Sequence, residues 1–136
     1  MKNKLIIGII SLFSIGISAQ KLDEKMIGCW KGTETDQQIE GMTKYWISCR
    51  QDDGKSILLF IALKDGEVVE QSTENGKWWT KDGKYYELHD YDGITDVYSY
   101  KLIGDNKVEY RSIELFGKPD NTYVFSDERI IEPKKK

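Results

Sequence analysis

Short runs in which apolar and polar residues alternate follow one another from residue 27 to residue 131. Between them lie Asp-Gly or Asp-Asn pairs, at residues 53–54, 65–66, 82–83, 92–93 and 105–106. These pairs readily adopt the positive φ that tight β-hairpins require. The pattern therefore predicts an all-β fold in which antiparallel strands are joined by short turns.

We predict eight strands from these runs. They span residues 27–35, 43–50, 56–64, 67–72 with a continuation at 76–80, 84–90, 94–103, 107–115 and 121–131. Eight sequential antiparallel strands with short turns can close into an up-and-down β-barrel, which removes exposed sheet edges. The interior of an eight-stranded barrel holds either packed side chains or one small ligand.

Alternation assigns several tyrosines to the barrel interior. Tyr98 and Tyr100 share one face of the strand at 94–103, and Tyr110 lies on the matching face of the next strand. We expect Trp46 to face them across the barrel. Because Tyr and Trp combine apolar area with a hydrogen-bonding tip, these four residues predict a pocket for a small apolar or aromatic molecule. The alternative is a filled barrel whose tyrosines bond to backbone or water.

The run at 57–63 differs from the others because it is apolar on both faces. One face belongs to the interior, so the outer face requires a cover. Two covers are open: the short segment at 20–26, which precedes the first strand, or a second copy of the protein in a homodimer.

The first nineteen residues have the pattern of a secretory signal peptide. Lys2 and Lys4 precede an apolar stretch at 5–17, and Ile-Ser-Ala at 17–19 forms a small-residue cleavage site. The stretch is too short and too rich in Gly and Ser to span a membrane as a helix. We therefore expect an exported protein, periplasmic or secreted, with a barrel domain at 20–131 and a basic tail at 132–136.

The net negative charge of the chain restricts the classes of molecule that it can bind. Residues 1–19 carry two lysines and no acid, so their removal changes the formal net charge from −3 to −5. A chain this acidic lacks the cationic surface on which affinity for nucleic acid rests, so nucleic acid is excluded as a partner.

The two cysteines lie in the first two predicted strands. If Thr35 pairs with Thr43, the antiparallel register places Cys29 directly opposite Cys49. Exported proteins meet an oxidising environment, so this register predicts a Cys29–Cys49 disulfide. The alternatives are two free thiols or a register shifted by one residue.

Gly28-Cys29-Trp30 opens the first strand. This placement resembles the G-x-W signature of lipocalins and the wider calycin superfamily, and Thr95-Asp96-Val97-Tyr98 loosely resembles a second lipocalin motif. The chain is similar to small exported bacterial lipocalin-like domains. The resemblance implies that Trp30 closes one end of the barrel and that Arg129, near the end of the last strand, packs over it. Both residues are then structural.

The sequence contains few residues that would indicate a metal site or a catalytic site. His89 is the only histidine, and a zinc site normally needs several nitrogen or sulfur ligands. We therefore expect no metal and no cofactor. No G-x-S-x-G elbow is present, and a single histidine would have to serve any catalytic triad.

We therefore expect an exported, lipocalin-like barrel that is not an enzyme and that binds a small ligand in its mouth. One alternative is an interaction module that binds another envelope protein through the outer face of 57–63 or through Trp78 and Trp79. The other is a small hydrolase or isomerase, for which Asp96 with a tyrosine is the candidate acid–base pair.

Overall fold

The computed structural model describes residues 21–134. These residues form one short 3-10 helix, η1 (Glu24–Met26), and a set of β-strands. The strands are β1 (Gly28–Thr35), β2 (Met42–Arg50), β3 (Lys55–Lys64), β4 (Glu67–Lys81), β5 (Lys84–His89), β6 (Thr95–Ile103), β7 (Lys107–Leu115), β8 (Lys118–Pro119) and β9 (Val124–Arg129).

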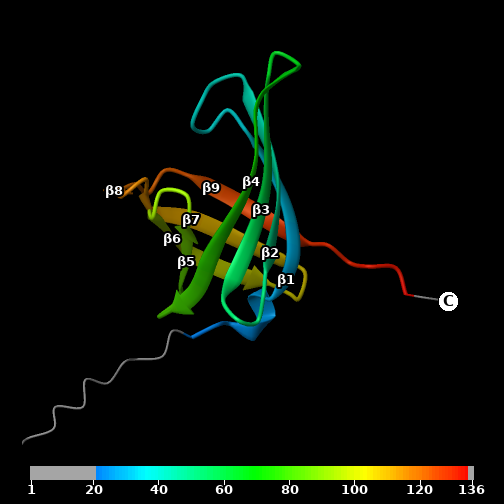
Figure 1. Ribbon diagram of the computed structural model, residues 1–136, viewed down its shortest axis with the longest axis vertical. Helices are drawn as coiled ribbons and strands as arrows, with labels where there is room; N and C mark the ends of the chain where they lie inside the picture. Colours follow the sequence, from blue (N-terminus) through cyan, green and yellow to red (C-terminus); the bar gives the residue numbers. More distant parts are fainter. Residues whose placement is uncertain (1–20, 135–136) are drawn as a thin grey trace, which may run out of the picture.

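Eight of these strands close into a barrel. Each of β1 to β6 pairs antiparallel with the next, β6 pairs with β7, and β9 lies between β7 and β1 and completes the ring (Figure 1). The two-residue β8 pairs with β7 alone. The predicted eight-stranded, antiparallel, up-and-down barrel is therefore confirmed. The expected strands at 67–72 and 76–80 are one long strand, β4, whose hairpin with β3 extends beyond the other strands (Figure 1).

Turn residues set where the strands reverse. Asp65-Gly66 and Asp82-Gly83 have positive φ at both residues, between 52° and 80°, as two-residue type I′ hairpins require. Phe116 and Gly117 have the same conformation and join β7 to β8. The reversal lies in the gap between the strands predicted at 107–115 and 121–131, but no Asp-Gly or Asp-Asn pair marks it, and phenylalanine rarely adopts positive φ.

The buried core fills one end of the barrel, called here the closed end. Trp30, Trp78 and Val108 are buried there, and Met26 of η1 packs against them. Lys21 forms a β-bridge with Thr80. The segment at 21–26 is therefore the plug of the closed end.

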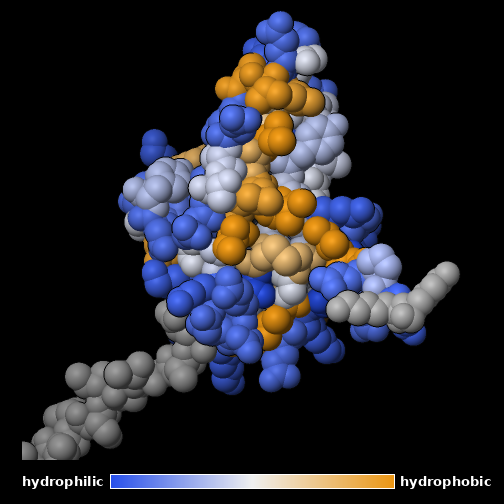
Figure 2. All heavy atoms as spheres, turned by 45° about the vertical axis from the view of Figure 1, so that its right-hand side comes forward, coloured by the Kyte–Doolittle hydropathy of each residue, from blue (hydrophilic) through white to orange (hydrophobic). Residues whose placement is uncertain are grey.

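No segment among residues 21–134 covers the outer face of β3. The segment that was one candidate lies at the closed end instead, so that expectation is wrong. Leu59 and Ile61 remain exposed, together with Tyr45 and Ile47 of β2. Figure 2 shows an apolar patch on this side of the molecule.

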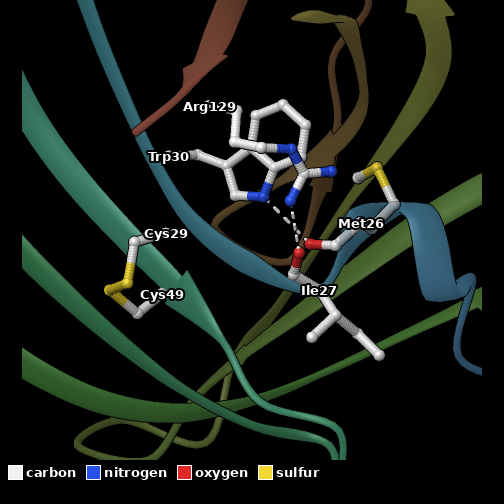
Figure 3. The surroundings of a disulfide bond; sticks show 6 residues. All are labelled: Met26, Ile27, Cys29, Trp30, Cys49 and Arg129. Carbon is white, nitrogen blue, oxygen red and sulfur yellow. Dashed lines mark hydrogen bonds between the residues drawn. A yellow bond between two sulfur atoms is a disulfide. The ribbon is translucent and has the colours of Figure 1, made fainter. Parts of the chain in front are cut away.

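The predicted disulfide is confirmed. Cys29 and Cys49 are partners in the β1–β2 register, their Cα atoms are 4.0 Å apart, and their sulfur atoms are bonded (Figure 3). The predicted signal peptide at 1–19 lies outside the described residues, as do residues 135–136 of the tail.

Between residues 21 and 134, no helix is long and apolar enough to cross a membrane.

Candidate ligand-binding cavity

Trp30 and Arg129 meet at the closed end. The Trp30 indole N–H donates to the carbonyl of Met26 at 3.0 Å, and the Arg129 guanidinium lies 4.3 Å from the Trp30 ring centroid (Figure 3). Arg129 also donates to the carbonyls of Ile27 and Lys25, both at 2.7 Å. The guanidinium therefore fastens the plug segment to β9 while it covers the tryptophan.

The glycine of the G-x-W signature has a physical role in this arrangement. Gly28 has a φ of +119°, and a Cβ added there would lie 2.9 Å from Nη1 of Arg129. A larger residue would therefore be strained in its backbone and would press against the guanidinium.

A buried charged layer lies next along the barrel. Arg50 donates from Nη2 to Asp127 Oδ2 and to the Tyr110 hydroxyl, both at 2.8 Å, and from Nε to the Tyr85 hydroxyl at 3.1 Å. The Trp46 indole N–H donates to the other Asp127 oxygen at 2.7 Å. Burial raises the pKa of Tyr85 and of Tyr110 well above the usual range, so both hydroxyls stay neutral. These hydrogen bonds satisfy both oxygens of Asp127 and the Nε and Nη2 atoms of Arg50. The buried Nη1 of Arg50 has no hydrogen-bond partner among residues 21–134.

Beyond this layer, the open end contains a cavity of about 330 Å³. Its walls include the aromatic residues Trp46, Phe60, Tyr98, Tyr123 and Phe125. Phe125 meets both Trp46 and Tyr98 edge to face, with ring centroids 5.3 Å apart in each pair. A concave, mainly apolar site of this size is typical of small-molecule binding.

A histidine held between two carboxylates lies at the mouth. His89 Nδ1 is 2.9 Å from Glu74 Oε2, and His89 Nε2 is 3.0 Å from Asp96 Oδ2. The other Asp96 oxygen accepts the backbone N–H of Phe116 at 3.0 Å, which fixes the β7–β8 turn beside the mouth. The hydrogen bond to Asp96, more than any other contact, raises the pKa of His89 to about 9, although burial opposes this. His89 is therefore protonated at neutral pH and donates to both carboxylates.

Glu87 also lines the cavity, and among residues 21–134 no hydrogen bond reaches its carboxyl group. Burial raises the pKa of this group, and the positive charges of His89 and Arg50 partly offset that effect. Glu87 is thus a polar side chain of the wall that is left available to a ligand. Ser48 Oγ and Arg50 Nη1 in the same wall are also buried without a hydrogen-bond partner among residues 21–134.

The four predicted pocket residues lie at different depths. Trp46 and Tyr98 line the cavity, whereas Tyr110 lies in the layer of Arg50. Tyr100 lies toward the closed end, where its hydroxyl donates to Asp23 at 2.8 Å. The structure therefore brings two of the four together at the cavity.

Arg50 and Glu87 were not predicted from the sequence to belong to this site. Tyr85, Glu87 and His89 alternate along β5, so their shared inward face was readable from the sequence. Arg50 follows Trp46 and Ser48 on β2 in the same way. Asp96, the candidate acid–base partner of a tyrosine, instead pairs with His89. Within residues 21–134, no group of three or more His, Cys, Asp or Glu residues is arranged to hold a metal ion.

Comparison with protein-family models and with curated proteins finds no match to this chain. The closed eight-stranded barrel is compatible with a calycin-like fold.

Proposed function

We propose that this protein binds one small, mainly apolar molecule in the cavity at the open end of its barrel and catalyses no reaction on it. The observation that supports this most is the cavity itself, about 330 Å³ with aromatic walls. A filled barrel would have placed interdigitated side chains there. The ligand's apolar part would lie against Trp46, Tyr98 and Phe125.

The charged groups of the site favour binding over catalysis. Both ring nitrogens of His89 are engaged by carboxylates, and its pKa of about 9 keeps the ring protonated at neutral pH. A general base must accept a proton near the working pH. His89 is unsuited to that role, and its ion cluster instead fixes β4, β5 and β6 around the mouth.

The proposal includes export and membership of the calycin superfamily. The G-x-W placement with Arg129 over Trp30 supports the family, and the Cys29–Cys49 bridge suits an oxidising compartment. Intact-mass analysis of the protein recovered from the cell envelope or medium should show a chain that begins at Gln20. Recovery of the full-length chain from the cytoplasm would contradict export.

Two neighbouring leucines provide a test of the cavity. Leu58 points into the cavity, whereas Leu59 is exposed on the outer face of the same strand. We expect the neutral dye N-phenyl-1-naphthylamine to gain fluorescence on binding the wild-type protein. Leu58→Trp fills the cavity and should weaken binding about tenfold or more, a loss of about 1.4 kcal/mol. Leu59→Trp adds the same ring outside the barrel and should leave the affinity unchanged.

Two results would contradict the proposal. One is an absence of dye binding by the wild-type protein. The other is equal binding by the two variants, which would place the dye on the outer surface. Circular dichroism of both variants checks that the barrel is intact.

A second candidate function is self-association through the outer face of β2 and β3. The observation that favours it is the exposed apolar group of Tyr45, Ile47, Leu59 and Ile61, which no described segment covers (Figure 2). Sedimentation equilibrium of the wild type and of Leu59→Lys tests this idea. A wild-type dimer that becomes a monomer in the variant supports it, and a monomeric wild type contradicts it.

A further inference from the structure

The cavity wall carries more negative than positive groups. It holds six Asp or Glu side chains and three cationic ones, Lys44, Arg50 and His89. Each of the three cations already has a close carboxylate partner. Lys44 lies 2.9 Å from Glu34, and Arg50 lies 2.8 Å from Asp127. The charge of each cation is therefore already balanced by a carboxylate, although Nη1 of Arg50 has no hydrogen-bond partner among residues 21–134.

The carboxylates are not balanced in the same way. His89 has one positive charge and two carboxylate partners, Glu74 and Asp96, at 2.9 and 3.0 Å. Glu87 adds a further carboxyl group that accepts no hydrogen bond from the described residues. The interior thus has an excess of negative charge at the level of Glu87, in a partly desolvated site where charge interactions are stronger than in water.

The aromatic walls complement a positive charge as well. The faces of Trp and Tyr rings attract cations when they are within about 6 Å of the ring centroid. The protein already uses this interaction in the same barrel, because the guanidinium of Arg50 lies 4.7 Å from the Tyr85 ring centroid. Lys44 Nζ lies 5.1 Å from the Tyr123 ring centroid.

We propose that the ligand is an organic cation, an amine or ammonium compound with an apolar body, whose positive group pairs with Glu87. The apolar body lies among Trp46, Tyr98 and Phe125. This inference rests on the proposed function, because it names the ligand class of the same cavity. A carboxylate ligand is disfavoured, since it would add a further negative charge beside Glu87. Arg50 could offer it the unpartnered Nη1, but the charge of Arg50 is already balanced by Asp127.

Three probes with one ring system test the charge of the ligand. 1-Naphthylmethylamine is a cation near neutral pH, 1-naphthalenemethanol is neutral, and 1-naphthoate is an anion. Isothermal titration calorimetry of the full exported chain with each probe should give the tightest binding for the amine and the weakest for the naphthoate. We expect the amine to bind about tenfold more tightly than the alcohol, the range of a charge-assisted hydrogen bond.

A matched pair of variants tests the role of Glu87. Glu87→Gln keeps the shape of the side chain and removes its charge, and should lower the affinity for the amine to about that for the alcohol. Glu109→Gln makes the same change in net charge on the outer face of β7, where Glu109 is exposed. This control should bind all three probes as the wild type does.

The possible results separate this inference from the proposed function. If no probe binds, both are overturned. If the alcohol or the naphthoate binds at least as tightly as the amine, the cavity binds ligands but the charge assignment is wrong. If the amine preference survives in Glu87→Gln, the positive group does not pair with Glu87.

Discussion

The Trp46 indole, which lines the cavity, lies against Gly32 of β1 and occupies the space that a side chain at this position would need. A Cβ built on Gly32 would lie 2.3 Å from Cζ2 of Trp46. The indole cannot simply move aside, since its N–H donates to Asp127 at 2.7 Å and its ring meets Phe125 edge to face. Gly32→Ala should therefore displace Trp46 or force the two strands apart.

Two effects of Gly32→Ala should lower the free energy of unfolding. Overpacking of a well-filled site costs about 1–3 kcal/mol. Loss of a hydrogen bond to a charged group adds about 1.5–3 kcal/mol if the indole leaves Asp127. We therefore expect Gly32→Ala to lower the free energy of unfolding by about 2.5–6 kcal/mol when both effects apply.

Urea denaturation followed by far-ultraviolet circular dichroism measures this change without relying on tryptophan fluorescence. Thr33→Ala, at the next and exposed position of β1, is the control and should cost about 1 kcal/mol or less. In the background Trp46→Leu, which removes the indole, the penalty of Gly32→Ala should largely disappear, because neighbouring positions are coupled. A single Gly32→Ala variant within about 1 kcal/mol of the wild type would refute this reasoning.

Three further predictions concern the structural residues. Trp30→Ala leaves a cavity at the closed end and should cost about 3–5 kcal/mol in urea denaturation, and a smaller effect than about 1 kcal/mol would contradict its structural role. Reduction of Cys29–Cys49 should lower stability by about 3 kcal/mol, because the bridge closes a loop in the unfolded chain, and alkylatable thiols in the native protein would contradict the bridge. The folded pKa of His89 lies above its unfolded value of 6.5, at about 9. Its contribution to stability is then fully present below pH 6.5 and is lost as the pH rises through 9. His89→Gln should remove this part of the pH dependence, which thermal melts between these limits measure, and an unchanged profile would show that another group is responsible.

Local patterns in the sequence were sufficient to predict the barrel. The two-residue alternation reports which side chains point inward, and the Asp-Gly pairs locate the reversals, as Asp65 and Asp82 show with their positive φ. The same logic predicted the register that places Cys29 opposite Cys49. Each of these features depends on neighbouring strands only, so no long-range information was needed.

The alternation of apolar and polar residues predicts which side chains face the barrel interior, but it does not predict at which level along the barrel axis each one lies. Tyr98 and Tyr100 share an inward face but lie about 7 Å apart along the strand, at two residues of about 3.3 Å each. One therefore reaches the cavity and the other the plug segment. The ion cluster of His89 was hidden for a related reason, because its partners come from β4 and β6 and meet only when the barrel closes.

The indole N–H signals of the tryptophans offer the most direct measurement of ligand binding in the cavity. Trp46 lines the cavity, Trp30 lies at the closed end, and Trp79 is stacked on Tyr86, with ring centroids 5.3 Å apart. During a titration with N-phenyl-1-naphthylamine, followed by two-dimensional ¹H–¹⁵N NMR, the Trp46 indole signal should shift saturably while the Trp30 and Trp79 signals stay in place. No shift at Trp46, or a larger shift at Trp79, would contradict binding inside the barrel.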